Sequence, residues 1–169
     1  HLWQPLAMHH TGFHITPEMR RRLAGVHLRG EDGAFTPLPF EITQEPEFHM
    51  GGGALYSTIG DYARFMRMVL NLGQLDGERV LKPETVATHL MLNQLGNARV
   101  RPLCAAIPLT ADAEFFPGLR KSWSLAFQIN EEVAPTGRAA GSLSWAGLAN
   151  SFFWIDPHTH IAGLLATQT

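Results

Sequence analysis

Cysteine, net charge and long apolar runs are all scarce in this sequence of 169 residues. Cys104 is the only cysteine, which excludes an internal disulfide and a metal site built from several cysteines. Lysine and arginine number 13 against 15 acidic residues, so the basic footprint of a nucleic-acid-binding or membrane-surface protein is missing. No apolar run approaches the roughly 20 residues that a membrane-spanning helix needs. The sequence therefore favours neither a nucleic-acid partner nor a membrane partner.

Apolar residues, in contrast, are plentiful. They make up 45% of the chain and charged residues only 17%, which is typical of a globular protein. A chain of this length can form one domain with a substantial core, so we expect residues 1–169 to belong to a single domain. The chain begins with His1 rather than Met and shows no secretory signal. Its last residues read as a core strand without a covering element, and we expect the chain to be part of a longer protein.

The clearest predicted helix runs from Ile59 to about Leu72. Thr58 provides the N-cap hydroxyl and Gly73 the C-terminal stop, while Asp61 suits the positive end of the helix dipole. Apolar residues recur at spacings of three and four, which predicts one buried face. The residues of this face are Ile59, Tyr62, Ala63, Met66, Val69 and Leu70.

Two shorter helices and a hairpin also have recognisable signals. Thr16 followed by Pro17 predicts a helix that runs to about Ala24, and Pro83 begins another that reaches about Asn93. Between them, the dipeptide Asp76-Gly77 predicts a small hairpin. Residues 27–48 and 95–120 contain several prolines and no sustained period, so we expect both to be long surface connections.

The glycine run Gly51, Gly52 and Gly53 removes all side chains from one short stretch. A phosphate-binding loop is excluded because no Lys-Ser or Lys-Thr pair follows. Two interpretations stay open, a main-chain wall of a binding pocket and a flexible turn.

The last third of the chain has the pattern of an antiparallel sheet. Short apolar runs alternate with turn residues such as Asp156-Pro157, and helices precede these strands rather than alternate with them. The fold class is therefore α+β, with helices packed on an antiparallel sheet. We expect residues 1–118 to be mainly helical and loop, and residues 119–169 to be strands. The expected strands cover residues 122–129, 139–145, 151–155 and 161–167.

Trp145-Ala146-Gly147 lies between two of these predicted strands. Gly147 has no Cβ, so the backbone there can approach a ligand, and a free N–H nearby can stabilise developing negative charge. The alternative is an ordinary hairpin of two core strands.

The machinery of acyl transfer is not complete in this chain. Gly141-Ser-Leu-Ser-Trp145 does not form a Gly-x-Ser-x-Gly motif, because its last residue is tryptophan. Neither Lys82 nor Lys121 has a serine three residues before it, so no Ser-x-x-Lys motif exists. The only tyrosines are Tyr56 and Tyr62, and neither has a visible catalytic partner.

Histidine is frequent enough to raise the question of a metal site. His10 and His14 are four residues apart, but Gly12 lies between them and no glutamate accompanies them. His158 and His160 flank a tight turn without an evident third ligand. We expect no metal and no cofactor, and a metal-dependent hydrolase is the weaker alternative.

Taken together, four ordered segments resemble the serine β-lactamase and penicillin-binding-protein superfamily. The similarity is to its C-terminal portion, in the class C-like branch that includes family VIII carboxylesterases. These segments are Pro5–Met8 with Thr11–Phe13, Gly52–Phe65, Leu75–Leu81 with Pro83–Thr85, and Trp145–Gly147 with Phe152–Pro157.

The resemblance implies a serine hydrolase whose Ser-x-x-Lys and tyrosine motifs precede this chain in the same protein. Trp145-Ala146-Gly147 would be the third catalytic motif, with the N–H of Leu148 as an oxyanion-hole donor. Gly51, Gly52 and Gly53 would border the acyl pocket, and Trp145 would form the opposite edge. The resemblance implies no cofactor and a small-molecule ester or amide substrate.

The third motif also bears on the substrate. Many β-lactamases have Lys-Thr-Gly there, and Trp145-Ala146-Gly147 lacks the cation and hydroxyl that bind a β-lactam carboxylate. We therefore expect a carboxylesterase with weak or no β-lactamase activity, and this chain alone to be inactive. The alternative is a non-catalytic relative that binds or regulates.

Overall fold

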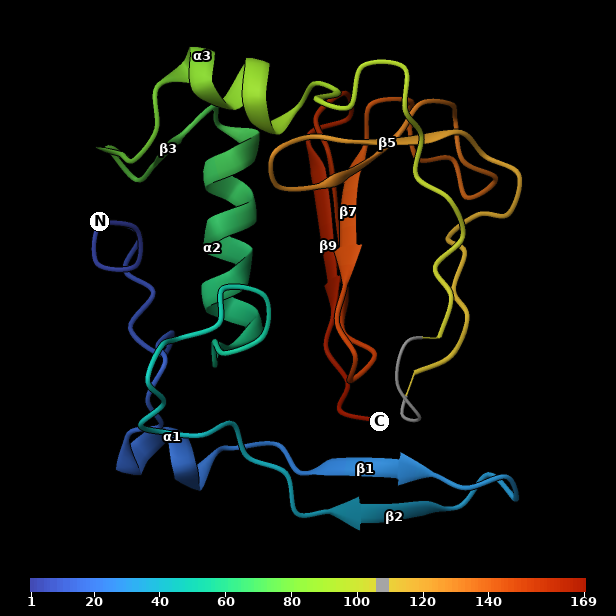
Figure 1. The fold of residues 1–169 in the computed structure, drawn as a ribbon. Coiled ribbons are helices and arrows are strands. Elements are labelled where there is room, and N and C mark those ends of the chain that lie inside the picture. Colours follow the sequence, from blue (N-terminus) through green and yellow to red (C-terminus); the bar gives the residue numbers. More distant parts are fainter. Residues whose placement is uncertain (106–109) are drawn as a thin grey trace.

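A five-stranded antiparallel sheet and one long helix organise the computed structural model, which describes residues 1–105 and 110–169 (Figure 1). Helix α2 contacts the sheet through β8 and β9. Apolar side chains from both elements are buried together, among them Met66 and Val69 of the helix and Leu143 and Ile155 of the sheet. This arrangement confirms the predicted α+β class of helices packed on an antiparallel sheet.

The sheet has the strand order β5-β6-β7-β8-β9, so each strand pairs with its neighbour in sequence. The three strands predicted over residues 139–167 are present: the first and the last are shorter than predicted, and the middle one is shifted by one residue. The single strand predicted over residues 122–129 is wrong, because the chain turns after Trp123. The hydroxyl of Ser124 accepts hydrogen bonds from the N–H groups of Ala126 and Phe127, a local pairing that competes with a continued strand. The strands are β5 Lys121–Trp123, β6 Gln128–Asn130, β7 Leu143–Ala146, β8 Phe152–Asp156 and β9 Ile161–Leu165.

Helix α2 spans Ile59–Leu70. The Thr58 hydroxyl accepts the Asp61 N–H at 3.2 Å, and Gly73 has a φ of +89°, as the sequence predicts for the two ends. The predicted face is only partly correct, because Ile59 is 55% exposed and Met68 is fully buried. Met68 is buried because α2 packs between the sheet and the N-terminal segment and so has more than one apolar face (Figure 1).

The shorter helices begin where predicted and end earlier. Helix α1 covers Pro17–Arg21, and α3 covers Pro83–Thr85 before the chain continues as a π-helical turn, η1, over Val86–Leu90. The predicted hairpin forms from β3 Gln74–Leu75 and β4 Glu78–Arg79. Among the described residues, no helix has both the length and the apolar character needed to cross a bilayer.

The long surface connection predicted over residues 27–48 contains a strand pairing that the sequence did not predict. Strands β1 (Val26–Arg29) and β2 (Phe35–Leu38) form a two-stranded antiparallel ribbon. Its turn contains Gly33 at a φ of +80° and an Asp32 carboxylate that accepts the Ala34 N–H. The ribbon is largely exposed and each of its strands has only 4 residues. The alternation in β1 is therefore very short, and β2 contains Pro37, which argues against a strand in the sequence. Most of the predicted connection over residues 95–120 lacks regular structure, apart from a bridge between Leu103 and Ala113, and residues 106–109 lie outside the described residues.

Candidate functional site

Strand β7 carries the Trp145-Ala146-Gly147 motif at its end, and only its first half is covered by β6. Beyond Ser144, the register pairs β7 with β8 alone. Neighbouring residues of an antiparallel strand direct their N–H and C=O groups to opposite sides. Since Gly147 donates to the Ser151 carbonyl on the β8 side, the backbone groups of Ala146 face the uncovered edge. The motif therefore ends on an open strand edge.

A three-residue loop, residues 148–150, forms the tip of the hairpin between β7 and β8. The Gly147 N–H donates to the Ser151 carbonyl at 2.8 Å, and the Asn150 N–H donates to the Gly147 carbonyl at 3.1 Å. Asn150 has a φ of +58°. These are the features of a type I turn followed by a left-handed residue, a common three-residue hairpin loop.

Leu148 occupies the second position of this turn, whose N–H makes no bond within the turn. No residue in the described part of the chain accepts a hydrogen bond from it, and the Leu148 residue is 74% exposed. The amide expected to act as an oxyanion donor is therefore free at the tip of the hairpin.

The glycines of the predicted site share a property that sets them apart from the other glycines. A Cβ built on Gly51, Gly52, Gly53 or Gly147 meets no atom within 4 Å, and none of the four has a positive φ. In contrast, a Cβ on Gly163 would lie 1.9 Å from the Trp154 ring. Neither backbone conformation nor packing in this structure requires glycine at those four positions, which leaves room for a ligand against the main chain.

The glycine turn is held by polar contacts between two of the ordered segments. Gly12 and Tyr56 exchange backbone hydrogen bonds of 3.0 and 2.9 Å. The buried Asp61 carboxylate accepts the His10 N–H and the Thr11 hydroxyl, both at 2.8 Å. These contacts join residues 10–12 to the stretch that follows the glycines. In Figure 1 this turn and the β7–β8 hairpin both lie toward the end of α2 at which that helix begins, and the β1–β2 ribbon lies beyond them.

Aromatic rings surround Trp145. Its ring packs edge-on against Trp123, with centroids 4.5 Å apart, and lies 6.2 Å from Phe115. Phe115 also contacts Phe152 at 6.1 Å. We call Trp145, Trp123, Phe115 and Phe152 the aromatic wall. Sequence reasoning found only Trp145, because Phe115 lies in a stretch without a period and nothing local marks it.

Lys121 holds the stretch that carries Phe115. The lysine is only 4% exposed, and its ammonium group donates to the carbonyls of Phe116 at 3.1 Å and Leu119 at 2.8 Å. The Glu114 carboxylate lies 3.7 Å from the same nitrogen. A buried ammonium requires such partners, so Lys121 acts here as a structural anchor.

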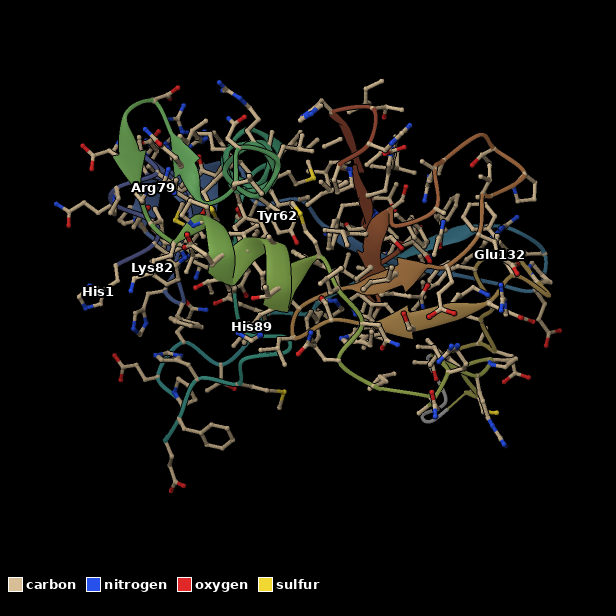
Figure 2. All side chains as sticks on the ribbon, turned by 90° about the horizontal axis from the view of Figure 1, so that it is seen from above. His1, Tyr62, Arg79, Lys82, His89 and Glu132 are labelled. Carbon is tan, nitrogen blue, oxygen red and sulfur yellow. The ribbon has the colours of Figure 1, made fainter. Side chains whose placement is uncertain are left out.

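The tyrosine of α2 is an unsuitable proton acceptor. Tyr62 lies on the side of α2 that faces the sheet, where its ring is 5.1 Å from that of Phe153 (Figure 2). Burial raises the pKa of Tyr62 to about 12, because the apolar surroundings disfavour the charged phenolate. At neutral pH its phenol stays protonated.

The histidines are dispersed. His10 lies 4.0 Å from Glu18, and the His14 ring packs edge-on against His49 at 5.2 Å. In the described parts of the chain, no three His, Cys, Asp or Glu side chains come together in a way that could hold a metal ion.

Comparison with known proteins identifies the family. The family model described as Beta-lactamase matches residues 1–169. The chain belongs to the beta-lactamase family. Among curated proteins, this beta-lactamase-family chain is similar to protein Rv1367c of Mycobacterium tuberculosis, with 30% identity over 167 residues. That match covers 97% of the chain and 40% of Rv1367c, so the chain spans about two fifths of the relative's length.

Solved structures agree with the family fold. The unliganded simvastatin synthase LovD from Aspergillus terreus superposes with a TM-score of 0.75 at 22% identity, over 99% of this chain and 42% of LovD. EstCE1, a hydrolase with promiscuous acyltransferase activity, superposes with a TM-score of 0.69 at 16% identity, over 99% of this chain and 44% of EstCE1. The predicted membership of the β-lactamase and penicillin-binding-protein superfamily is confirmed, and the roles of individual site residues stay predictions.

Proposed function

We propose that this chain is the C-terminal part of a serine hydrolase that cleaves ester or amide bonds through an acyl-enzyme. A carboxylesterase with weak or no β-lactamase activity fits best. The proposal rests on the free N–H of Leu148, which lies at the tip of a hairpin beside an open strand edge. Membership of the beta-lactamase family supports it.

In the proposed reaction, a serine from outside this chain adds to the substrate carbonyl carbon while its proton passes to a base. The carbonyl oxygen becomes an oxyanion, and the Leu148 N–H donates a hydrogen bond to it. The intermediate then expels the alcohol or amine, which takes up the proton held by the base, and water hydrolyses the acyl-enzyme and restores the serine hydroxyl. One such donor contributes about 3 kcal/mol to transition-state stabilisation in a serine hydrolase.

The surroundings of the open edge favour an apolar substrate. Trp145 and Ala146 provide no cation or hydroxyl that could pair with a substrate carboxylate. The aromatic wall supplies apolar surface beside the motif. An ester without a carboxylate at this position therefore fits better than a β-lactam.

Acyl transfer to an alcohol instead of water is a second candidate, because an apolar wall can bind an alcohol acceptor and hinder water. EstCE1, one of the similar solved structures, is a hydrolase with promiscuous acyltransferase activity.

The test uses the full-length protein, with p-nitrophenyl butyrate and a chromogenic cephalosporin as substrates. We expect turnover of the ester and little of the cephalosporin. Leu148→Pro removes the N–H, and proline suits the second position of a type I turn, so the hairpin should form. We expect kcat to fall about 100-fold or more. Leu148→Ala keeps the N–H and is the matched control.

Wild-type turnover by Leu148→Pro would contradict the assigned amide. A full-length protein that neither turns over esters nor forms a covalent adduct with a fluorophosphonate would support the non-catalytic alternative instead. Residues 1–169 alone should show no turnover, because they contain no Ser-x-x-Lys motif.

A further inference from the structure

The hairpin tip that carries the Leu148 amide is held by residues that follow β9. The Thr167 hydroxyl donates to the Asn150 carbonyl at 2.6 Å and lies 3.2 Å from the Ala149 carbonyl. In return, the Ser151 hydroxyl donates to the Thr167 carbonyl at 3.0 Å. All three residues that follow Leu148 in the chain are thus bonded to Thr167.

The neighbouring tail residues extend this contact. The Thr169 N–H donates to the Ala149 carbonyl at 3.3 Å, and the Asn150 side-chain amide donates to the Thr169 carbonyl. On the other side, the N–H of His27 in β1 donates to the Gln168 carbonyl at 2.9 Å. Residues 167–169 are therefore hydrogen-bonded to both the ribbon and the hairpin, and they support the tip.

The hairpin needs such a support because its loop is otherwise weakly held. The loop closes on two internal hydrogen bonds, and Leu148 itself packs little, since it is 74% exposed. An oxyanion donor must lie 2.7–3.1 Å from the position of the developing charge. A displacement of about 1 Å in a reacting group can cost about 100-fold in rate.

We propose that Thr167 is a positioning residue, whose hydroxyl fixes the β7–β8 hairpin so that the Leu148 amide meets the oxyanion. This inference rests on the proposed hydrolase function. In this role Thr167 acts through the hairpin and not through a contact with the substrate. Its hydroxyl therefore affects stabilisation of the transition state, measured by kcat, and not binding of the substrate.

Thr167→Val tests the inference, because valine keeps the shape and removes the hydroxyl. In the full-length protein we expect kcat for p-nitrophenyl butyrate to fall about tenfold, which is less than the loss for removing a donor. KM should stay within about twofold, because the substrate ground state makes little use of the oxyanion contact. Thr167→Ser restores the hydroxyl and should recover most of kcat.

The matched control is Thr88→Val. The Thr88 hydroxyl also donates to a backbone carbonyl at 2.6 Å, that of Glu84, but in a helix away from the hairpin. We expect Thr88→Val to keep the wild-type kcat. If Thr167→Val does not fold, Ser151→Ala removes the reciprocal bond to the same tail and should lower kcat in the same way.

Folded Thr167→Val with the wild-type kcat would overturn the positioning role, and so would a loss that Thr167→Ser fails to recover. A rise in KM at constant kcat would also overturn it, because that pattern reports ground-state binding. These outcomes differ from failure of the proposed function, in which the wild-type protein and Leu148→Ala would themselves lack turnover.

Discussion

Replacing Gly147 by alanine tests whether this glycine is needed for activity or for folding. The added methyl group meets no atom within 4 Å in this structure, and the residue has no positive φ. Alanine at a compatible position stabilises a protein by about 0.4–1 kcal/mol, chiefly because the unfolded chain loses conformational freedom. We therefore expect Gly147→Ala to leave the free energy of unfolding unchanged or slightly raised.

Gly163→Ala, in strand β9, is the matched comparison. Its Cβ would lie 1.9 Å from the Trp154 ring, which also stacks under the Arg138 guanidinium at 4.5 Å. The ring must move and lose that contact, and overpacking of this kind costs about 1–3 kcal/mol. The two variants should therefore differ in unfolding free energy by about 1.5–4 kcal/mol.

The assay combines urea denaturation with ester hydrolysis on the full-length protein. We expect Gly147→Ala to keep its stability and lose at least about tenfold in kcat/KM, because the methyl group occupies space that the substrate needs. A variant with full activity would refute the functional interpretation of Gly147. A variant destabilised by more than about 1 kcal/mol would show that the glycine is needed for folding.

Two further predictions concern α2. Asp61→Ala leaves the His10 N–H and the Thr11 hydroxyl without their buried acceptor, and we expect a loss of about 2–4 kcal/mol in urea denaturation. A loss below about 1 kcal/mol would contradict this account. Since burial raises the pKa of Tyr62 to about 12, the unfolded state loses its proton first as pH rises, and stability should fall between about pH 10 and 12. Tyr62→Phe should remove this part of the pH dependence, and an unchanged profile would argue against the shift.

Local signals were enough for elements whose ends are marked by side-chain chemistry. The capping hydroxyl of Thr58 and the left-handed Gly73 act within a few residues of sequence, so the bounds of α2 could be predicted. The same signals did not reveal the β1–β2 ribbon, because its strands have only 4 residues each and β2 contains a proline. It also joined β5 and β6 into one strand, because a serine hydroxyl that bonds two N–H groups has no distinct sequence signal.

For the candidate site, the Trp145-Ala146-Gly147 motif and the glycine run were visible in the sequence, since both are compositionally unusual. Their surroundings were not. Phe115 reaches Trp145 from a stretch without a period, held there by the buried Lys121, and Thr167 reaches the hairpin from beyond the next strand.

The amino-acid sequence by itself determined the fold class, the position of the main helix and of the last three strands, and membership of the beta-lactamase family, because these follow from periodicity, caps and ordered motifs along the chain. Only the tertiary structure decided that the pairing of β7 with β6 ends at Ser144, that the Leu148 amide is left free, and that the residues after β9 hold the hairpin. The physical reason is that a hydrogen bond made, or left unmade, between distant segments depends on how the folded chain brings those segments together, which no local pattern encodes.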